Sequence, residues 1–93
     1  MRRRAKVDAN QSAIVAALRD RGAYVQSLAE VGSGCPDLLV GYRGRTILME
    51  IKSHEKALLT KDQNTWANCW NGGPLWVVYT VDQAVEILER LEE

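Results

Sequence analysis

The sequence predicts a single small α/β domain in which helices flank a mixed four-stranded sheet. Three observations predict it: two segments with helical spacing of apolar residues near the ends of the chain, several apolar runs of strand length between them, and the capping-box sequence Thr60-Lys61-Asp62-Gln63 before a further helix. The 93 residues are 46% hydrophobic and 26% charged, which is typical of a folded domain and not of a disordered chain. We therefore expect residues 1–93 to form one domain.

The first helix is expected from Asp8 to about Arg21, and Gly22 supplies its stop signal. The residues that repeat at helical spacing along it are Ile14, Ala17, Leu18 and Arg21. Asp8 and Gln11 also have the spacing of a capping box. Residues 23–29 alternate well enough for a strand, and a glycine-containing loop follows them.

Two further apolar runs, residues 37–42 and 45–52, have the spacing of a β-hairpin because only Arg43-Gly44 separates them. Short connections favour antiparallel pairing of neighbouring strands. We therefore expect the first three strands to form an antiparallel meander.

The second half of the chain predicts a helix, a strand and a last helix. The helix after Thr60 is predicted by residues that repeat at helical spacing and form one stripe along it, and Asn71-Gly72-Gly73-Pro74 ends the helix. That stripe consists of Gln63, Trp66, Ala67 and Trp70. Residues 75–80 form a short buried strand, which the helical crossover should place parallel to the third strand. The residues that face the core from the last helix are expected to be Val81, Val85, Leu88 and Leu91.

The hairpin register gives the first candidate site. If Tyr42 and Arg45 flank a symmetric turn, Asp37 lies opposite Glu50, and Lys52 projects from the same face. Side chains directly opposite in an antiparallel pair have Cβ atoms roughly 4.5–5.5 Å apart, so two carboxylates there repel each other. A divalent cation with oxygen ligands offsets such repulsion, and the pattern therefore predicts a metal site.

A surface interpretation of the same residues is the alternative. Asp37 would then only begin a strand after Pro36, while Glu50 and Lys52 would form an exposed pair at a sheet edge. A one-residue bulge or an odd-length turn would place Asp37 on the opposite face and remove the predicted site.

The segment Pro36-Asp37 with Glu50-Ile51-Lys52 resembles the PD-(D/E)XK nuclease superfamily and, within it, the virus-type replication-repair nuclease (VRR-NUC) family. The resemblance extends over most of the chain, because the blocks at 8–11, 34–41, 48–53 and 59–63 and Trp70 also fit the family pattern. It implies a restriction-endonuclease-like αβββαβα core.

The resemblance also implies the role of each site residue. Asp37 and Glu50 would ligate Mg²⁺ or Mn²⁺, and the backbone carbonyl of Ile51 would add a ligand. Lys52 would orient or help to deprotonate the attacking water and stabilise the phosphate. Gln63 would steady the site or the scissile phosphate, and its position on an apolar helix stripe is otherwise unexpected.

The family pattern usually has a glutamate on the first helix, three residues before a glutamine. Asp8 stands at that position here, before Gln11, so its carboxylate is one methylene shorter. Asp8 is therefore either a metal ligand or the N-cap of the helix, and Gln11 could be only the second half of that cap.

These implications predict a metal-dependent DNA endonuclease. The family's small members resemble Holliday-junction resolvases, which favours branched DNA as substrate and a homodimer, since a two-fold dimer doubles the phosphate contacts of one small domain. Two alternatives stay open: a non-catalytic DNA- or protein-binding module, and a nuclease subunit of a larger replication or repair complex. We expect a cytoplasmic protein with no nucleotide cofactor.

The overall charge excludes some classes of protein. Lys and Arg number 12 and Asp and Glu number 12, so bulk attraction to nucleic acid is excluded. A basic arm at residues 1–6 and an acidic tail at 82–93 nevertheless make the charge uneven, and the arm could touch phosphate or simply aid solubility. No apolar run has the length of a membrane helix, and no segment resembles a secretory signal.

Other residues have weaker assignments. The two cysteines lack the spacing of a zinc site and are expected to be free, small, buried residues, while the lone His54 is expected in a loop. Several basic residues could contact the DNA backbone or be plain surface: Arg43, Arg45, Lys56 and Lys61. The three tryptophans could stack on bases but are expected to serve in packing or in a dimer face.

Overall fold

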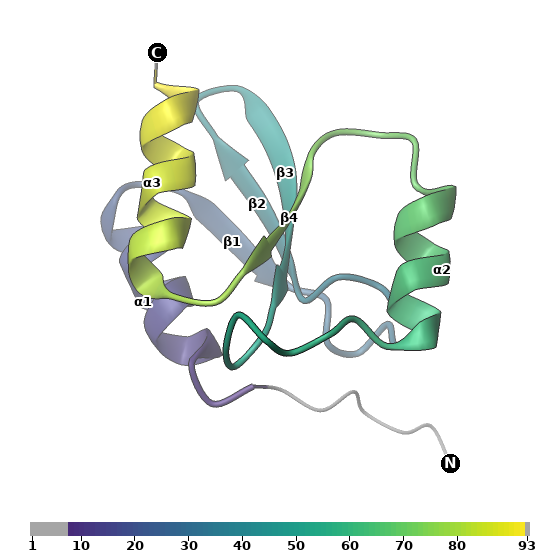
Figure 1. Cartoon of the computed structure of the whole chain (residues 1–93). Helices are drawn as coiled ribbons and strands as arrows, with labels where there is room; N and C mark the ends of the chain where they lie inside the picture. Colours follow the sequence, from purple (N-terminus) through teal and green to yellow (C-terminus); the bar gives the residue numbers. More distant parts are fainter. Residues whose placement is uncertain (1–7, 93) are drawn as a thin grey trace.

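The computed structural model describes residues 8–92 (Figure 1). The predicted basic arm at 1–6 lies outside these residues. The predicted order of elements, α-β-β-β-α-β-α, is confirmed. The elements are α1 (Gln11–Asp20), β1 (Tyr24–Ser27), β2 (Leu38–Tyr42), β3 (Arg45–Ile51), α2 (Lys61–Cys69), β4 (Leu75–Val78) and α3 (Val81–Leu91).

The four strands form one mixed sheet in the order β1-β2-β3-β4. β1 to β3 pair antiparallel and β4 runs parallel to β3, as the connection lengths predicted. Tyr42 pairs with Arg45, and Arg43 and Gly44 form the turn with φ of 49° and 78°. Two positive φ values are typical of the primed turns that match the twist of a hairpin. The predicted register is therefore confirmed.

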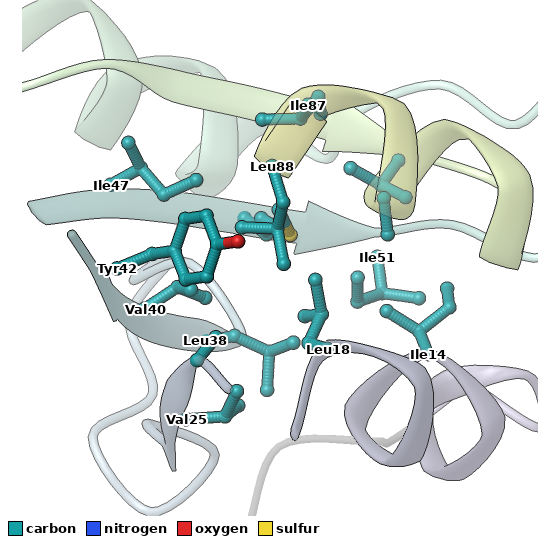
Figure 2. Close-up of a cluster of buried hydrophobic side chains, with 14 residues drawn as sticks. Ile14, Leu18, Val25, Leu38, Val40, Tyr42, Ile47, Ile51, Ile87 and Leu88 are labelled. Atoms are coloured by element: carbon teal, nitrogen blue, oxygen red, sulfur yellow. The ribbon is translucent and has the colours of Figure 1, made fainter. Parts of the chain in front are cut away.

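The helices divide between the two faces of the sheet. α1 and α3 pack against each other and cover one face, whereas α2 lies on the other side (Figure 1). Because side chains alternate along a strand, Met49 and Ile51 of β3 enter the core under α1 and α3, and Glu50 faces the α2 side. Figure 2 shows this core, to which α1 contributes Ile14 and Leu18. No residue of α2 is fully buried, so the α2 face is the more open one.

α1 begins differently from the prediction. Its N-cap position is occupied by Asn10 and not by Asp8, and no side chain caps the helix. Asn10 Nδ2 donates instead to the carbonyl oxygens of Lys52 (3.0 Å) and Tyr79 (2.7 Å), which ties the start of α1 to the ends of β3 and β4. The Gln11 N–H is satisfied by the backbone oxygen of Asp8 at 3.1 Å. The predicted capping box of Asp8 and Gln11 is therefore wrong, because backbone and tertiary contacts replace it.

The hairpin tip is held by the end of α3 and lies far from the candidate site. Arg43 Nη2 is 3.2 Å from Glu92 Oε1 and its guanidinium lies over the Tyr42 ring. Arg45 begins β3, about 17 Å along the strand from Glu50 at 3.4 Å per residue. Arg43 and Arg45 therefore lie at the end of the sheet opposite the candidate site and not near it, while their contact with DNA stays a prediction.

A small loss of stability is expected when Tyr42 is replaced by phenylalanine. The Tyr42 hydroxyl donates to Glu92 Oε1 at 2.9 Å, a partly buried bond to a charged acceptor, so Tyr42→Phe should lower the free energy of unfolding by about 1 kcal/mol. Urea denaturation measures this, and Tyr24→Phe is the control because Tyr24 is 75% exposed. Equal effects of the two substitutions would contradict the assigned role of the bond.

Candidate metal centre

The predicted site residues other than Ile51 line one open cavity of about 310 Å³ on the α2 side of the sheet, whereas the Ile51 side chain is buried in the core. Four segments form it: the residues just before α1, the loop that leads into β2, the end of β3, and the first turn of α2. Its lining residues are Asp8, Gly32, Ser33, Gly34, Cys35, Asp37, Glu50, Lys52, Thr60, Asp62 and Gln63. The sheet register thus brings Asp37, Glu50 and Lys52 together as predicted, and α2 adds Gln63 from the other side.

Asp37 lies immediately before β2, one position beyond the pair Leu38 and Met49, so the register places it opposite Glu50. Its Oδ2 accepts a hydrogen bond from the backbone N–H of Ile51 at 2.7 Å, and its own backbone oxygen accepts from Leu28. The Asp37 carboxylate is therefore fixed by the neighbouring strand.

The same register explains why the carbonyl of Ile51 is suited to bind a cation. In a strand, the N–H and C=O of one residue point towards the same neighbour, and the N–H of Ile51 points to Asp37. If the register is extended two positions beyond the pair of Leu38 and Met49, Pro36 lies opposite Ile51. Proline has no N–H, so it offers no hydrogen bond to this carbonyl. The carbonyl oxygen of Ile51 therefore lies on the side of the strand where the carboxylate of Asp37 is held.

Glu50 is the most buried charged residue of the site, with a relative exposure of 4%. Its Oε2 accepts a hydrogen bond from Gln63 Nε2 at 3.0 Å and lies 3.9 Å from Lys52 Nζ. Lys52 Nζ in turn donates to Gln63 Oε1 at 2.6 Å. Gln63 thus bridges the Lys52 ammonium and the Glu50 carboxyl group, which accounts for a polar residue on the inward stripe of α2.

Burial and mutual repulsion change the protonation of the two carboxyl groups. Burial, the hydrogen bond to Asp37 and the Asp37 charge raise the pKa of Glu50 to about 8. Burial also raises the pKa of Asp37, although hydrogen bonds from Glu50 and Ile51 oppose the change. Without a cation, Glu50 therefore keeps a proton at neutral pH, as expected for two carboxyl groups that share one small space.

The donor set of the cavity fits a hard divalent cation. Among residues 8–92, no three side chains of His, Cys, Asp and Glu are grouped so as to hold a metal ion. The predicted protein ligands are the two carboxylates of Asp37 and Glu50 and the carbonyl of Ile51. Mg²⁺ is usually held by only one or two carboxylates, with waters and substrate phosphate completing its shell. Among the described residues, the cavity lining also carries four acidic residues and one basic residue, Lys52, and such an excess of acidic groups attracts cations. These four are Asp8, Asp37, Glu50 and Asp62.

Asp8 lines this cavity, and its charge raises the pKa of both Asp37 and Glu50. It does not cap α1, so its role as a helix cap is excluded and a role at the site stays a prediction. Gln11 is buried, and its Oε1 has no partner among the described residues. The glutamine is therefore not the second half of a cap.

The prediction for the cysteines was half right. Cys35 and Cys69 are both free, but Cys35 is only partly buried and Cys69 is exposed, so neither is the buried residue that was expected. Cys35 borders the cavity, and burial together with the charges of Glu50 and Asp37 raises the pKa of its thiol. Its thiolate is therefore disfavoured in the metal-free site.

Trp66 of α2 and Trp70, which follows the helix and is 42% exposed, contact each other. The rings of Trp66 and Trp70 stack on each other with centroids 5.0 Å apart, and Trp70 Nε1 donates to the carbonyl of Gly73 at 2.7 Å. Trp76 lies on β4 and is 37% exposed. The inward face of α2 is therefore occupied by contacts within the chain. His54 is an exposed loop residue, as expected.

Sequence reasoning singled out Asp37, Glu50, Lys52 and Gln63, and all four reach the cavity. It recognised the Thr60 capping box but not that Thr60 borders the site, and it assigned no role to Gly34 or Asn10. A glycine or a cap residue has no side-chain signature of a site, so only the folded arrangement reveals them.

Compared with protein-family models, curated proteins and solved structures, the chain matches none of them. No helix within residues 8–92 has the length and apolar character needed to cross a lipid bilayer.

Proposed function

We propose that this protein is a Mg²⁺- or Mn²⁺-dependent endodeoxyribonuclease of the PD-(D/E)XK type, similar to the VRR-NUC family. One observation carries the proposal: Asp37, Glu50 and Lys52, the three residues of the sequence motif, line one cavity together with Gln63. The buried position of Glu50 favours a site over the alternative of an exposed ion pair at a sheet edge.

The chemistry follows from the charges. A phosphodiester carries negative charge, and a cavity with four acidic residues repels it. A bound divalent cation supplies positive charge at the phosphate and lowers the pKa of water. Asp37, Glu50 and the Ile51 carbonyl would hold the ion, and Asp8 is a candidate for an additional contact.

Lys52 is the group that would act on the attacking water. Its side chain is 12% exposed and is held beside Glu50 by Gln63, so it reaches the cavity with little conformational freedom. From there its ammonium would orient the water and stabilise the charge that develops on the phosphate. Gln63 would keep this group in place.

Branched DNA, such as a four-way junction, is the proposed substrate, and a homodimer in the cytoplasm is the proposed active form. One 10.4 kDa domain offers few phosphate contacts, and a two-fold dimer doubles them in an arrangement that suits a four-way junction.

Lys52→Met tests the proposal most directly. With a fluorescent four-way junction and Mg²⁺, cleavage by this variant should fall about 100-fold because the water loses its positioning group. Mn²⁺ binding, measured by calorimetry, should persist because both carboxylates remain.

The control is Arg90→Met, on an exposed residue of α3, across the sheet from the cavity; its cleavage rate should be that of the wild type. Unchanged cleavage by Lys52→Met would remove Lys52 from the mechanism, and absence of cleavage by a wild-type protein that binds metal would reject the nuclease activity.

A second candidate is a DNA-binding module that keeps the fold without turnover. The aspartate at position 8, in place of the family's glutamate, favours it. This candidate predicts junction binding that Mg²⁺ does not change. A third, a nuclease subunit of a larger complex, predicts cleavage only after replication or repair proteins are added.

A further inference from the structure

The amide of Gln63 has a defined orientation. Its Oε1 accepts two hydrogen bonds, from the backbone N–H of Thr60 at 2.9 Å and from Lys52 Nζ at 2.6 Å. Both partners can only donate, so the oxygen must face them. The Nε2 group is therefore turned towards Glu50, whose Oε2 lies 3.0 Å away.

This orientation keeps Lys52 and Glu50 apart. Lys52 Nζ is 3.9 Å from Glu50 Oε2 but only 2.6 Å from Gln63 Oε1. Without the amide between them, the Lys52 ammonium and Glu50, once its proton is lost, would be free to close into a direct charge-assisted hydrogen bond. Such a pair would occupy both groups and leave neither for a cation or a phosphate.

The capping box of α2 sets the position of this amide. Thr60 Oγ1 accepts from the Gln63 N–H at 3.2 Å, and the Gln63 side chain accepts from the Thr60 N–H. The two bonds that begin the helix are therefore the bonds that aim Gln63 into the cavity.

Gly34, in the loop that leads to β2, also contributes to the position of the Gln63 amide, because it lies against the first turn of α2. A Cβ atom at this position would clash with the carbonyl of Asp62 and would lie 2.9 Å from the Gln63 nitrogen. The residue also has a φ of +85°, which favours glycine. Only glycine thus lets the loop that leads to Asp37 lie against the first turn of α2.

We propose that Thr60 and Gly34 are positioning residues of the metal centre. They fix the Gln63 amide between Lys52 and Glu50, so that the Lys52 ammonium and the Glu50 carboxylate stay separate. This inference rests on the proposed nuclease function for its effect on turnover. Its structural part, the fixed amide, stands independently of that function.

The chain contains a matched control for Thr60. Thr80 and Gln83 form the same capping box at the start of α3, with a 3.2 Å bond from the Gln83 N–H to Thr80 Oγ1. Gln83 Oε1 accepts only from backbone N–H groups, those of Tyr79 and Thr80. Thr60→Ala and Thr80→Ala therefore remove the same bond, from the glutamine N–H to the threonine hydroxyl, but only the first is at the cavity.

The experiment compares the wild type with Thr60→Ala, Thr60→Ser and Thr80→Ala. In Thr60→Ala, kcat for junction cleavage should fall about tenfold with little change in KM, as for a group that orients a metal site. In the metal-free protein, the side-chain amide NMR signals of Gln63 should move towards their unfolded positions, while those of Gln83 stay. Thr60→Ser should restore both kcat and the Gln63 amide signals. Thr80→Ala should lower the stability of the protein without changing kcat or the Gln63 signals.

Equal kcat losses in Thr60→Ala and Thr80→Ala, or Gln63 signals unchanged in Thr60→Ala, would overturn the proposal. If the wild type cleaves no DNA, the nuclease function fails, and the amide signals alone then decide whether Thr60 positions Gln63.

Gly34→Ala is tested against Gly44→Ala in the same two assays. Both glycines have a similar positive φ, but a Cβ at Gly44 meets nothing within 4 Å. Gly34→Ala should move the Gln63 signals and lower kcat, whereas Gly44→Ala should only reduce stability. Identical behaviour of the two variants would show that backbone strain, and not contact with α2, makes glycine necessary.

Discussion

Glu50→Gln is expected to reduce Mg²⁺-dependent cleavage of four-way DNA junctions by at least about 1,000-fold. Loss of this carboxylate removes half of the carboxylate ligands of the proposed centre, and a bound cation contributes several kcal/mol to stabilising a phosphoryl transition state. Each tenfold in rate corresponds to about 1.4 kcal/mol, so the expected loss corresponds to about 4 kcal/mol.

The same substitution should make the metal-free protein more stable near pH 8. Glu50 has a relative exposure of 4% and lies beside Asp37, so its ionisation in the folded protein is unfavourable. A neutral glutamine of the same shape avoids that ionisation. A site that costs stability when empty is typical of a functional centre and not of a structural ion pair.

Cleavage assays and thermal melting with EDTA measure the two effects. The control is Glu86→Gln on α3, which removes an exposed pair with Arg90 worth only about 0.5 kcal/mol. If Glu50→Gln lowers the melting temperature of the metal-free protein and leaves cleavage intact, Glu50 is a structural residue and the proposed centre is wrong.

The register could be predicted from sequence because local rules determine it. The two residues Arg43 and Gly44 are too few for any turn but a tight one, and a tight turn fixes the pairing of every later residue in the hairpin. Once Tyr42 faces Arg45, the positions of Asp37 and Glu50 follow by alternation. The order of the elements and the juxtaposition of Asp37 and Glu50 could therefore be predicted from the sequence.

The failed predictions concern residues whose partners are distant in the chain. Asp8 has the spacing of a cap, but Asn10 reaches the ends of β3 and β4 instead and the helix begins after it. The sequence also contained no sign that Arg43 binds Glu92 at the end of α3. Local patterns contain no information on such long-range contacts, and the approach of Gly34 to α2 was hidden for the same reason.

The zero net charge has a structural counterpart at the cavity. Within residues 8–92, four acidic residues and one lysine line the cavity, so these residues together favour a cation over a phosphate. A phosphate would approach this cavity only after cations have bound. In the proposed nuclease, dependence on metal and discrimination against DNA in its absence would thus have the same cause.

The largest expected effect on stability is its dependence on pH. The pKa of Glu50 is about 8 in the folded protein against an ordinary value of 4.5, and that of Asp37 is also raised. Between pH 4.5 and about pH 8, Glu50 binds a proton in the folded state more than in the unfolded state. This contribution to stability is therefore largest at low pH and is lost as pH rises. The free energy of unfolding of the metal-free protein should therefore drop by on the order of 2 kcal/mol between about pH 5 and pH 8.

Divalent cations should reverse this dependence, because they bind the deprotonated carboxylates and only in the folded state. Urea denaturation at several pH values, with EDTA or with Mn²⁺, measures both curves. Glu50→Gln should flatten the EDTA curve and abolish most of the stabilisation by Mn²⁺, whereas Glu86→Gln should follow the wild type. A wild-type curve that is flat with EDTA would mean that Glu50 is already ionised in the folded protein. The unfavourable burial and repulsion of the two carboxylates, which the proposed cation relieves, would then not exist.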